Sequence, residues 1–127
     1  MAAERIAILG GGLMGHGIAQ VFAAAGHRVK ITDPSAEARS HILDRIGGNL
    51  DDLGASRASL DRIEVVESLE RCVVDADWVF EAAPEELELK QQIFAEVERA
   101  APPDAILAYL AEILPLLYRR VTLDDAF

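Results

Sequence analysis

Five of the nine glycines of this 127-residue chain lie within eight residues, in a spacing that can bind a phosphate group. Residues 10–15 match the pattern Gly-x-Gly-x-x-Gly, which occurs where a strand turns into a helix. Gly10 permits the tight turn, Gly12 lets the backbone approach a pyrophosphate because it has no Cβ, and Gly15 lets the helix pack against the sheet. Free N–H groups at the helix start, together with the helix dipole, attract phosphates. This segment is therefore the candidate anion site.

Asp33 follows Gly10 by 23 residues and ends the next apolar segment, residues 28–33, which is typical of a strand. Its carboxylate can accept hydrogen bonds from both hydroxyls of an adenosine ribose, and it would repel a 2′-phosphate. No arginine follows Asp33 directly, so the sequence favours NAD over NADP. Two alternatives remain open for the glycines: a purely structural turn, or the related turn of FAD-binding and methyl-donor-binding folds.

The elements that must position these residues alternate between strands and helices. Short β-branched segments predict strands, and longer segments with apolar residues three or four positions apart predict helices. Strands are expected at residues 5–9, 28–33, 63–66, 78–82 and 105–108, and helices at 13–25, from Ser35 to Leu53, at 68–74, and from Pro84 to the prolines at 102–103. This alternation implies parallel strands joined by right-handed crossovers. We therefore predict an α/β fold: an open, doubly wound, mostly parallel sheet of about five or six strands.

Caps and buried faces are predicted for the helices as well. Gly26 is placed to end the first helix and Ser35 to cap the second, although Gly47-Gly48 weakens the continuity of that second helix. Two sets of apolar residues recur at helical spacing and predict buried faces. They are Ile42, Ile46, Leu50 and Leu53 in the second helix, and Leu89, Ile93, Phe94 and Val97 in the last.

The composition disfavours several classes of function. The chain carries 12 Lys+Arg against 22 Asp+Glu, a net charge of −10, which disfavours nucleic acid and anionic membranes as partners. Residues 1–32 hold three bases and one acid, so this part has a net charge of +2 and suits an anion site. A single cysteine excludes a disulfide framework, and the acidic pairs lack the spacing of a metal site. We expect a cytoplasmic protein without a membrane span.

Three segments resemble a known family, the NAD-binding domain of 3-hydroxyacyl-CoA dehydrogenases. They are residues 8–20 (ILGGGLMGHGIAQ), Asp33-Pro34, and residues 80–85 (FEAAPE) followed by Leu89-Lys90. The resemblance covers about residues 4–108. It implies a Rossmann-type NAD-binding domain over residues 1–108, followed by a divergent tail at 109–127 that forms either a short helix or a junction. Dehydrogenases of free hydroxy acids, such as carnitine and gulonate dehydrogenases, share much of the pattern.

The resemblance also implies how NAD would be held. The pyrophosphate would lie against Gly10, Gly11, Gly12, Leu13, Met14 and Gly15, and the adenosine ribose against Asp33. Glu85 and Lys90 would line the cofactor site near the nicotinamide. The residues alone also allow another interpretation, in which Glu85 stabilises the start of a solvated helix and Lys90 pairs with Glu86.

The activity implied by the resemblance is oxidation of an L-3-hydroxyacyl group, on CoA, to the 3-keto form with hydride transfer to NAD. The family's substrate-facing Asn-Thr-Ser segment has no counterpart, because Tyr109-Leu110-Ala111 follow the fifth strand here. We also expect this chain to lack the family's catalytic histidine, partner glutamate and C-terminal helical domain, and we expect none of His16, His27 and His41 to act as the base.

We therefore predict no catalytic residue and no metal in this chain, and binding of NAD(H) without turnover. Acyl-CoA would be a partner of the complete enzyme only, and any homo-oligomer would not form through the family's helical domain. An alternative from another class is a non-catalytic nucleotide-binding or interaction module.

Overall fold

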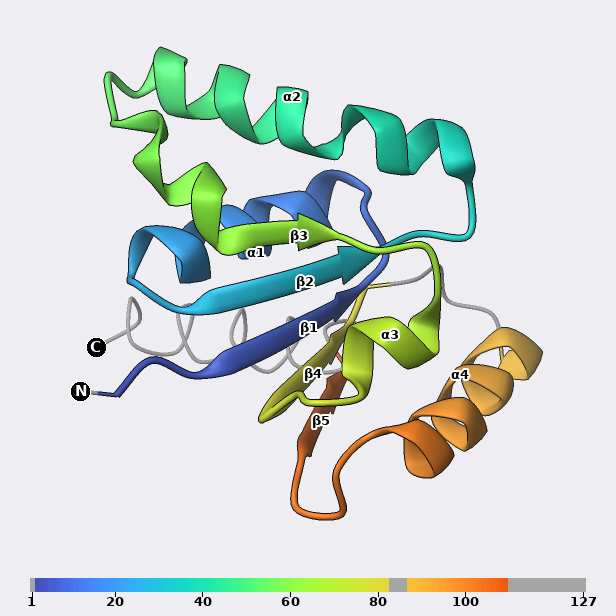
Figure 1. The fold of residues 1–127 in the computed structure, drawn as a ribbon. Helices are drawn as coiled ribbons and strands as arrows, with labels where there is room; N and C mark the ends of the chain where they lie inside the picture. The colour runs from blue at the N-terminus through green and yellow to red at the C-terminus, as the bar shows by residue number, and fades with distance from the viewer. Residues whose placement is uncertain (1, 83–86, 110–127) are drawn as a thin grey trace, which may run out of the picture.

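The computed structural model describes residues 2–82 and 87–109, and Figure 1 shows their arrangement. The strands of this part of the chain are β1 (Arg5–Leu9), β2 (Arg28–Thr32), β3 (Ile63–Val65), β4 (Trp78–Glu81) and β5 (Ile106–Tyr109). The helices are α1 (Leu13–Ala24), α2 (Ala36–Asp52), α3 (Leu69–Val73) and α4 (Leu87–Ala100), with a 3-10 helix, η1 (Arg57–Arg62), before β3. Within residues 2–82 and 87–109, every predicted strand and helix is present near its predicted bounds. The short helix η1 was not predicted, because so few residues show no clear period.

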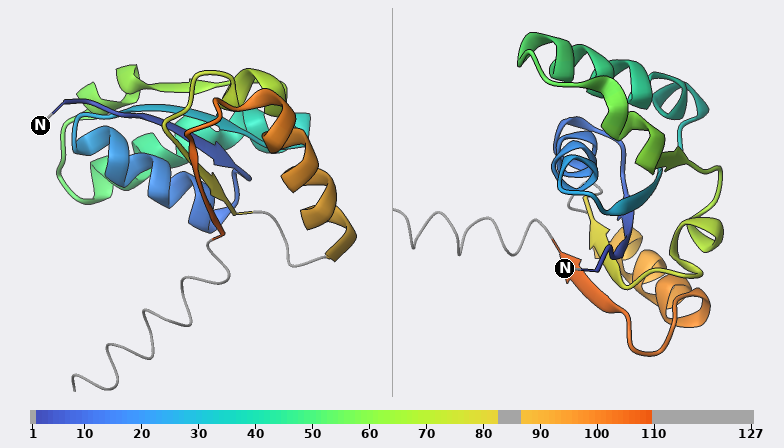
Figure 2. Two further views of the ribbon diagram at one scale, coloured as in Figure 1. Left: turned by 90° about the horizontal axis from the view of Figure 1, so that it is seen from below. Right: turned by 60° about the vertical axis from the view of Figure 1, so that its left-hand side comes forward.

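The strands form one sheet in the order β3-β2-β1-β4-β5, and every pairing in it is parallel. The chain runs outward from β1 to β3 and then returns to β4 on the other side of β1. Right-handed crossovers in the two halves put helices on opposite faces. Accordingly, α1 and α2 cover one face and α3 and α4 the other (Figures 1 and 2). The predicted doubly wound α/β fold is confirmed, and folds of this kind bind ligands where the strand order reverses.

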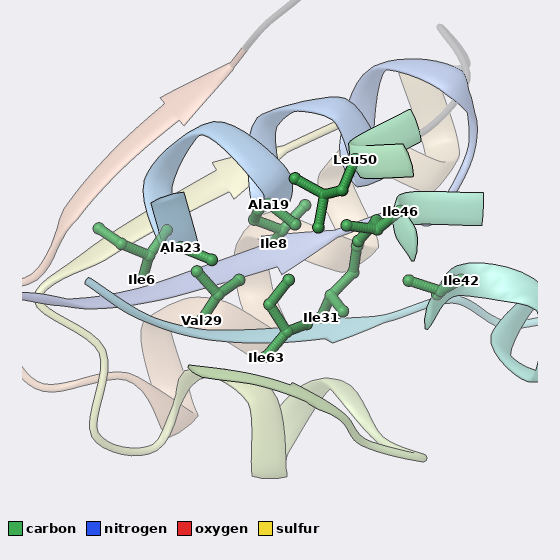
Figure 3. Close-up of a cluster of buried hydrophobic side chains, with 10 residues drawn as sticks. All are labelled: Ile6, Ile8, Ala19, Ala23, Val29, Ile31, Ile42, Ile46, Leu50 and Ile63. Carbon is green, nitrogen blue, oxygen red and sulfur yellow. The ribbon is translucent and has the colours of Figure 1, made fainter. Parts of the chain in front are cut away.

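The central strand β1 is buried on both faces, which explains its uninterrupted apolar sequence. Ile6 and Ile8 belong to the cluster under α1 and α2, whereas Ala7 and Leu9 belong to the cluster under α3 and α4. Figure 3 shows the first cluster, to which α2 contributes Ile42, Ile46 and Leu50. The carboxyl end of β1 is therefore anchored from both sides, and the turn that follows it starts from a rigid base.

Both predicted helix caps are confirmed. The Ser35 hydroxyl accepts a hydrogen bond from the N–H of Ala38 at 3.2 Å. Gly26 has a φ of 98° and follows α1, where its N–H donates to the carbonyl of Ala23 and the N–H of His27 donates to that of Phe22. This is the hydrogen-bond pattern of a Schellman motif, which only a left-handed residue completes without strain.

Two predicted core positions are wrong. Leu53 is 72% exposed because it lies at the C-cap of α2, past the last buried turn. Phe94 is 41% exposed on α4, whereas its neighbour Ile93 is buried together with Val97. The apolar stripe of α4 is narrower than the sequence suggested, because positions 93 and 97 lie one above the other and position 94 is rotated away from them.

The helix α2 continues through Gly47-Gly48 without a break. At Gly47 a Cβ would lie 3.1 Å from the guanidinium carbon of Arg57, so the missing side chain makes room for η1 to pack closely. Pro84 and Glu85, as well as the tail at 110–127, lie outside the described residues.

Candidate functional site

The predicted glycine turn connects β1 directly to α1. Gly10 has a φ of 111°, a conformation that residues with a Cβ rarely adopt, and its N–H donates to the carbonyl of Thr32 at 2.8 Å. A Cβ on Gly15 would overlap the carbonyl oxygen of Gly10 and lie 2.8 Å from its carbon. The first turn of α1 can therefore approach the strand end only because residue 15 is glycine.

The two middle glycines face opposite directions. Gly11 is buried, and a Cβ there would lie 2.5 Å from Cδ1 of Ile42 on α2. Gly12 is exposed, and a Cβ there would meet no protein atom within 4 Å. Gly11 thus packs the turn against the protein, and Gly12 presents bare backbone to open space.

Asp33 is held beside this turn by two backbone hydrogen bonds. Its Oδ2 accepts from the N–H of Gly11 and its Oδ1 from the N–H of Ser35, each at 2.9 Å. The carboxylate therefore joins the end of β2 to the turn after β1, and it is half-buried. The sequence predicted only that Asp33 ends the strand after the glycines, and the structure shows that it contacts the glycine turn directly through Gly11.

The remaining residues of the turn lie at the start of α1. Leu13 is 86% exposed and Met14 is 38% exposed. His16 is 5% exposed, and its Nδ1 lies 2.6 Å from the carbonyl oxygen of Gly12. Because a carbonyl only accepts, Nδ1 carries the proton in this hydrogen bond. His16 therefore ties the first turn of α1 to the glycine segment.

A pocket of about 560 Å³ opens at this edge of the sheet, a size that falls within the range of small-molecule sites. Gly10, Gly12 and Asp33 line one wall. The opposite wall comes from α4, which contributes Leu89 and Ile93. The pocket thus lies where the strand order reverses, between the carboxyl ends of β1 and β2 and helix α4.

Sequence reasoning missed most of the far wall of this pocket. Glu67, from the connection between β3 and α3, and Leu69, the first residue of α3, line it together with Gln92 and Glu96 of α4. An isolated polar residue on a helix carries no signal of its own, because only the packing of α3 against α4 decides which side faces the pocket. Lys90 is half-buried on α4, next to the pocket residue Leu89, and Glu85 lies outside the described residues.

Glu81 is a second acid at this edge, and its burial was not predicted from the sequence. Glu81 ends β4, pairs in register with Leu9 of β1, and is only 1% exposed. Its position after an apolar strand was the available signal. The parallel register then brings it to the same edge as the glycine turn, since the carboxyl ends of parallel strands lie together.

The cysteine and the other two histidines are not among the residues that line this pocket. Burial raises the pKa of the Cys72 thiol to about 12, and its Sγ lies 3.3 Å from the carbonyl oxygen of Lys30. A thiol with so high a pKa is a poor nucleophile. His27 Nδ1 accepts a hydrogen bond from the N–H of Glu4, and His41 is exposed on α2. Within the described residues, no cluster of three or more His, Cys, Asp or Glu side chains is arranged to hold a metal ion.

Residues 5–115 of this chain match the family model described as 3-hydroxyacyl-CoA dehydrogenase, NAD binding domain. The chain belongs to this family. Its structure is similar to that of (S)-3-hydroxybutyryl-CoA dehydrogenase from Ralstonia eutropha, with a TM-score of 0.77 and 30% identity over 85% of this chain and 41% of that one. The fold, the family and NAD as the cofactor agree with the interpretation of the sequence.

Two curated relatives differ in the substrates that their names state. The chain is 34% identical to an L-carnitine dehydrogenase of Streptomyces coelicolor, over 96% of this chain and 40% of the relative. It is 36% identical to a 3-hydroxyadipyl-CoA dehydrogenase of Escherichia coli, over 82% of this chain and 23% of the relative. The chain thus spans two-fifths or less of these relatives. Family members are NAD-dependent oxidoreductases, and this chain corresponds to their NAD-binding domain. None of the described helices is both long enough and apolar enough to cross a membrane.

Proposed function

We propose that this chain forms the NAD(H)-binding part of a dehydrogenase that oxidises an L-3-hydroxyacyl group, carried on CoA, to the 3-keto form. The observation that carries the proposal is the contact between Asp33 and the glycine turn at the mouth of one pocket. A carboxylate fixed at this place suits the ribose hydroxyls of NAD, and an open backbone at Gly12 suits its pyrophosphate.

Each part of the site has a role in this proposal. The turn at residues 10–15 holds the pyrophosphate and Asp33 holds the adenosine ribose, and the family resemblance assigns Glu85 and Lys90 to the nicotinamide side. NAD supplies the hydride acceptor when bound, and the chain's own residues bind and orient it. The hydrogen bonds from Gly11 and Ser35 keep the Asp33 carboxylate in place before the cofactor arrives. This preorganisation reduces the ordering cost of binding.

We also propose that the 127-residue chain, assayed by itself, binds NAD(H) without oxidising a substrate. Neither His16, His27 nor His41 is among the residues that line the pocket. A general base must lie within hydrogen-bond reach of the proton that it removes. The purified chain should therefore produce no NADH from 3-hydroxybutyryl-CoA, and measurable NADH formation would refute this part of the proposal.

A second candidate substrate is a free hydroxy acid such as carnitine. It is favoured by the L-carnitine dehydrogenases of Streptomyces coelicolor, Nocardiopsis dassonvillei and Streptomyces griseus, which are 34%, 36% and 38% identical to this chain. The two candidates differ in whether CoA is needed. The test uses the protein isolated from its native source and measures NADH formation from 3-hydroxybutyryl-CoA and from L-carnitine. The substrate that gives NADH identifies the correct candidate.

The cofactor site itself is tested by titrating the chain with NADH and with NADPH. NADH should bind more tightly, because the Asp33 carboxylate accepts from the ribose and repels a 2′-phosphate. Replacing Asp33 by Ala should weaken NADH binding by about tenfold, the effect of one charge-assisted hydrogen bond, and narrow the gap between the cofactors. Asp33→Asn is the matched control, since it removes the charge and keeps an acceptor for Gly11 or Ser35. Equal, weak binding of both cofactors by the unaltered chain would contradict the assignment.

A further inference from the structure

The side chain of Arg39 reaches back from α2 to the end of β2. Its Nη1 donates to the carbonyl oxygen of Asp33 at 2.7 Å and lies 3.4 Å from that of Pro34. Arg39 is half-buried, and it is six residues beyond Asp33 in the chain. A fixed positive charge therefore lies beside the residue to which we assign the ribose.

The carboxylate of Asp33 does not neutralise this charge by direct contact. Both carboxylate oxygens accept from backbone N–H groups, those of Gly11 and Ser35. The ion pairs within residues 2–82 and 87–109 do not include one between Arg39 and Asp33. Arg39 is instead bound to main-chain carbonyls, and both of these bonds use a single nitrogen of a group that has five N–H donors.

We propose that Arg39 determines cofactor specificity together with Asp33. The Arg39 guanidinium would bind the 2′-phosphate of an adenosine, and the Asp33 carboxylate prevents this binding. This inference rests on the proposed NAD(H) site, because Asp33 must hold the ribose for the 2′-substituent to lie near it. The Asp33 carboxylate excludes the phosphate by repulsion, and the guanidinium beside it attracts a phosphate. Cofactor choice is then set by the pair and not by Asp33 alone.

The chemistry of the guanidinium supports this role. Arginine binds phosphate through two parallel N–H donors, and its charge does not titrate near neutral pH. A hydrogen bond to a charged partner changes affinity by about 10- to 100-fold. When the carboxylate of Asp33 is removed, this attraction should become measurable as a gain in NADPH affinity, and it should depend on the residue at position 39.

Arg45 provides a matched control on the same helix. It lies six residues beyond Arg39 on α2 and is exposed. Neither Arg39 nor Arg45 is among the residues that line the pocket with Asp33, and Arg39 differs from Arg45 in that it donates to the carbonyls of Asp33 and Pro34. Replacing Arg45 by Gln removes the same charge from the same helix, so long-range electrostatics are matched and only the contact with the end of β2 differs.

The experiment compares Asp33→Ala with two double variants, one carrying Arg39→Gln and one carrying Arg45→Gln, in titrations with NADPH and with NADH. We expect Arg39→Gln to lower the NADPH affinity of Asp33→Ala by about tenfold or more and to change its NADH affinity by less than about twofold. The Arg45→Gln double variant should bind both cofactors as Asp33→Ala does. The NADPH affinity of Asp33→Ala should also fall more steeply with salt than its NADH affinity.

Several results would overturn the inference. Equal NADPH affinities of the two double variants would do so, and so would a parallel loss of NADH and NADPH binding with Arg39→Gln, which indicates only a structural anchor. If the double variant with Arg39→Gln does not fold, Arg39→Lys replaces Arg39→Gln in the Asp33→Ala background. Lysine keeps the positive charge but lacks the two parallel N–H donors of arginine, so this double variant should bind NADPH more weakly than Asp33→Ala does. Failure of the proposed function gives a different result, since the unaltered chain would then show no preference for NADH. A normal preference with no effect at position 39 would reject only the role of Arg39.

Discussion

Replacing Gly12 by Ala separates the folding of the glycine turn from its binding of a ligand. Gly12 is the N-cap of α1, with φ −69° and ψ −166°, angles that alanine adopts without strain. A methyl group there would meet no protein atom within 4 Å, and Gly12 lines the candidate pocket. The added methyl group would thus occupy space that the protein leaves open and that the proposal gives to a pyrophosphate.

The expected effects on stability and on binding differ in size. Alanine lowers the conformational entropy of the unfolded chain, which stabilises the fold, but it is a poorer N-cap than glycine, which destabilises it. Because these two effects oppose each other, the free energy of unfolding should change by less than about 1 kcal/mol. Binding should suffer more, because the methyl group holds the phosphates away from the N–H groups of the turn. Loss of one hydrogen bond to a charged group corresponds to about 1.5–3 kcal/mol, or roughly a 10- to 100-fold higher Kd for NADH.

The assay is an NADH fluorescence titration, paired with urea unfolding of the same samples. Gly17→Ala is the matched control, because a Cβ at this position in α1 also meets nothing within 4 Å. It should raise the free energy of unfolding by about 1 kcal/mol, as expected for alanine inside a helix, and leave the Kd unchanged. An NADH Kd for Gly12→Ala within twofold of the unaltered chain would refute the approach of the pyrophosphate to Gly12.

Three further predictions concern stability. Gly15→Ala should lower the free energy of unfolding by at least about 1–3 kcal/mol in urea titrations, because its methyl group would overlap the backbone of Gly10, which cannot rotate away. An unchanged free energy of unfolding would contradict the close packing of the turn. Ser35→Ala should cost about 1 kcal/mol by the same measurement, because the hydroxyl caps α2 at the N–H of Ala38; no loss would show that the cap is dispensable. Burial raises the pKa of the Cys72 thiol from 9.0 to about 12, so above pH 9 the unfolded chain loses a proton that the native chain keeps. The free energy of unfolding should therefore fall between pH 9 and pH 12, and Cys72→Ala should reduce this slope; equal slopes would exclude the thiol as its source.

The order of strands and helices followed from the sequence because the signals involved are local. The apolar segment of β1, the cap at Ser35 and the left-handed residue Gly26 each depend on a few neighbouring residues. The glycine pattern was informative for the same reason, since Gly10 and Gly15 meet within a single turn of the chain. These features determined the fold class and the position of the candidate anion site.

Contacts between segments far apart in the chain were decided only by the tertiary structure. The hydrogen bond from Gly11 to Asp33 and the bond from Arg39 to the Asp33 carbonyl depend on how β2 and α2 lie against β1. The far wall of the pocket requires α4 to pack beside α3, and that packing also leaves Phe94 exposed. A periodic pattern specifies that a helix has an apolar face, and the neighbouring elements decide how wide that face is and which polar residues at its border face a ligand.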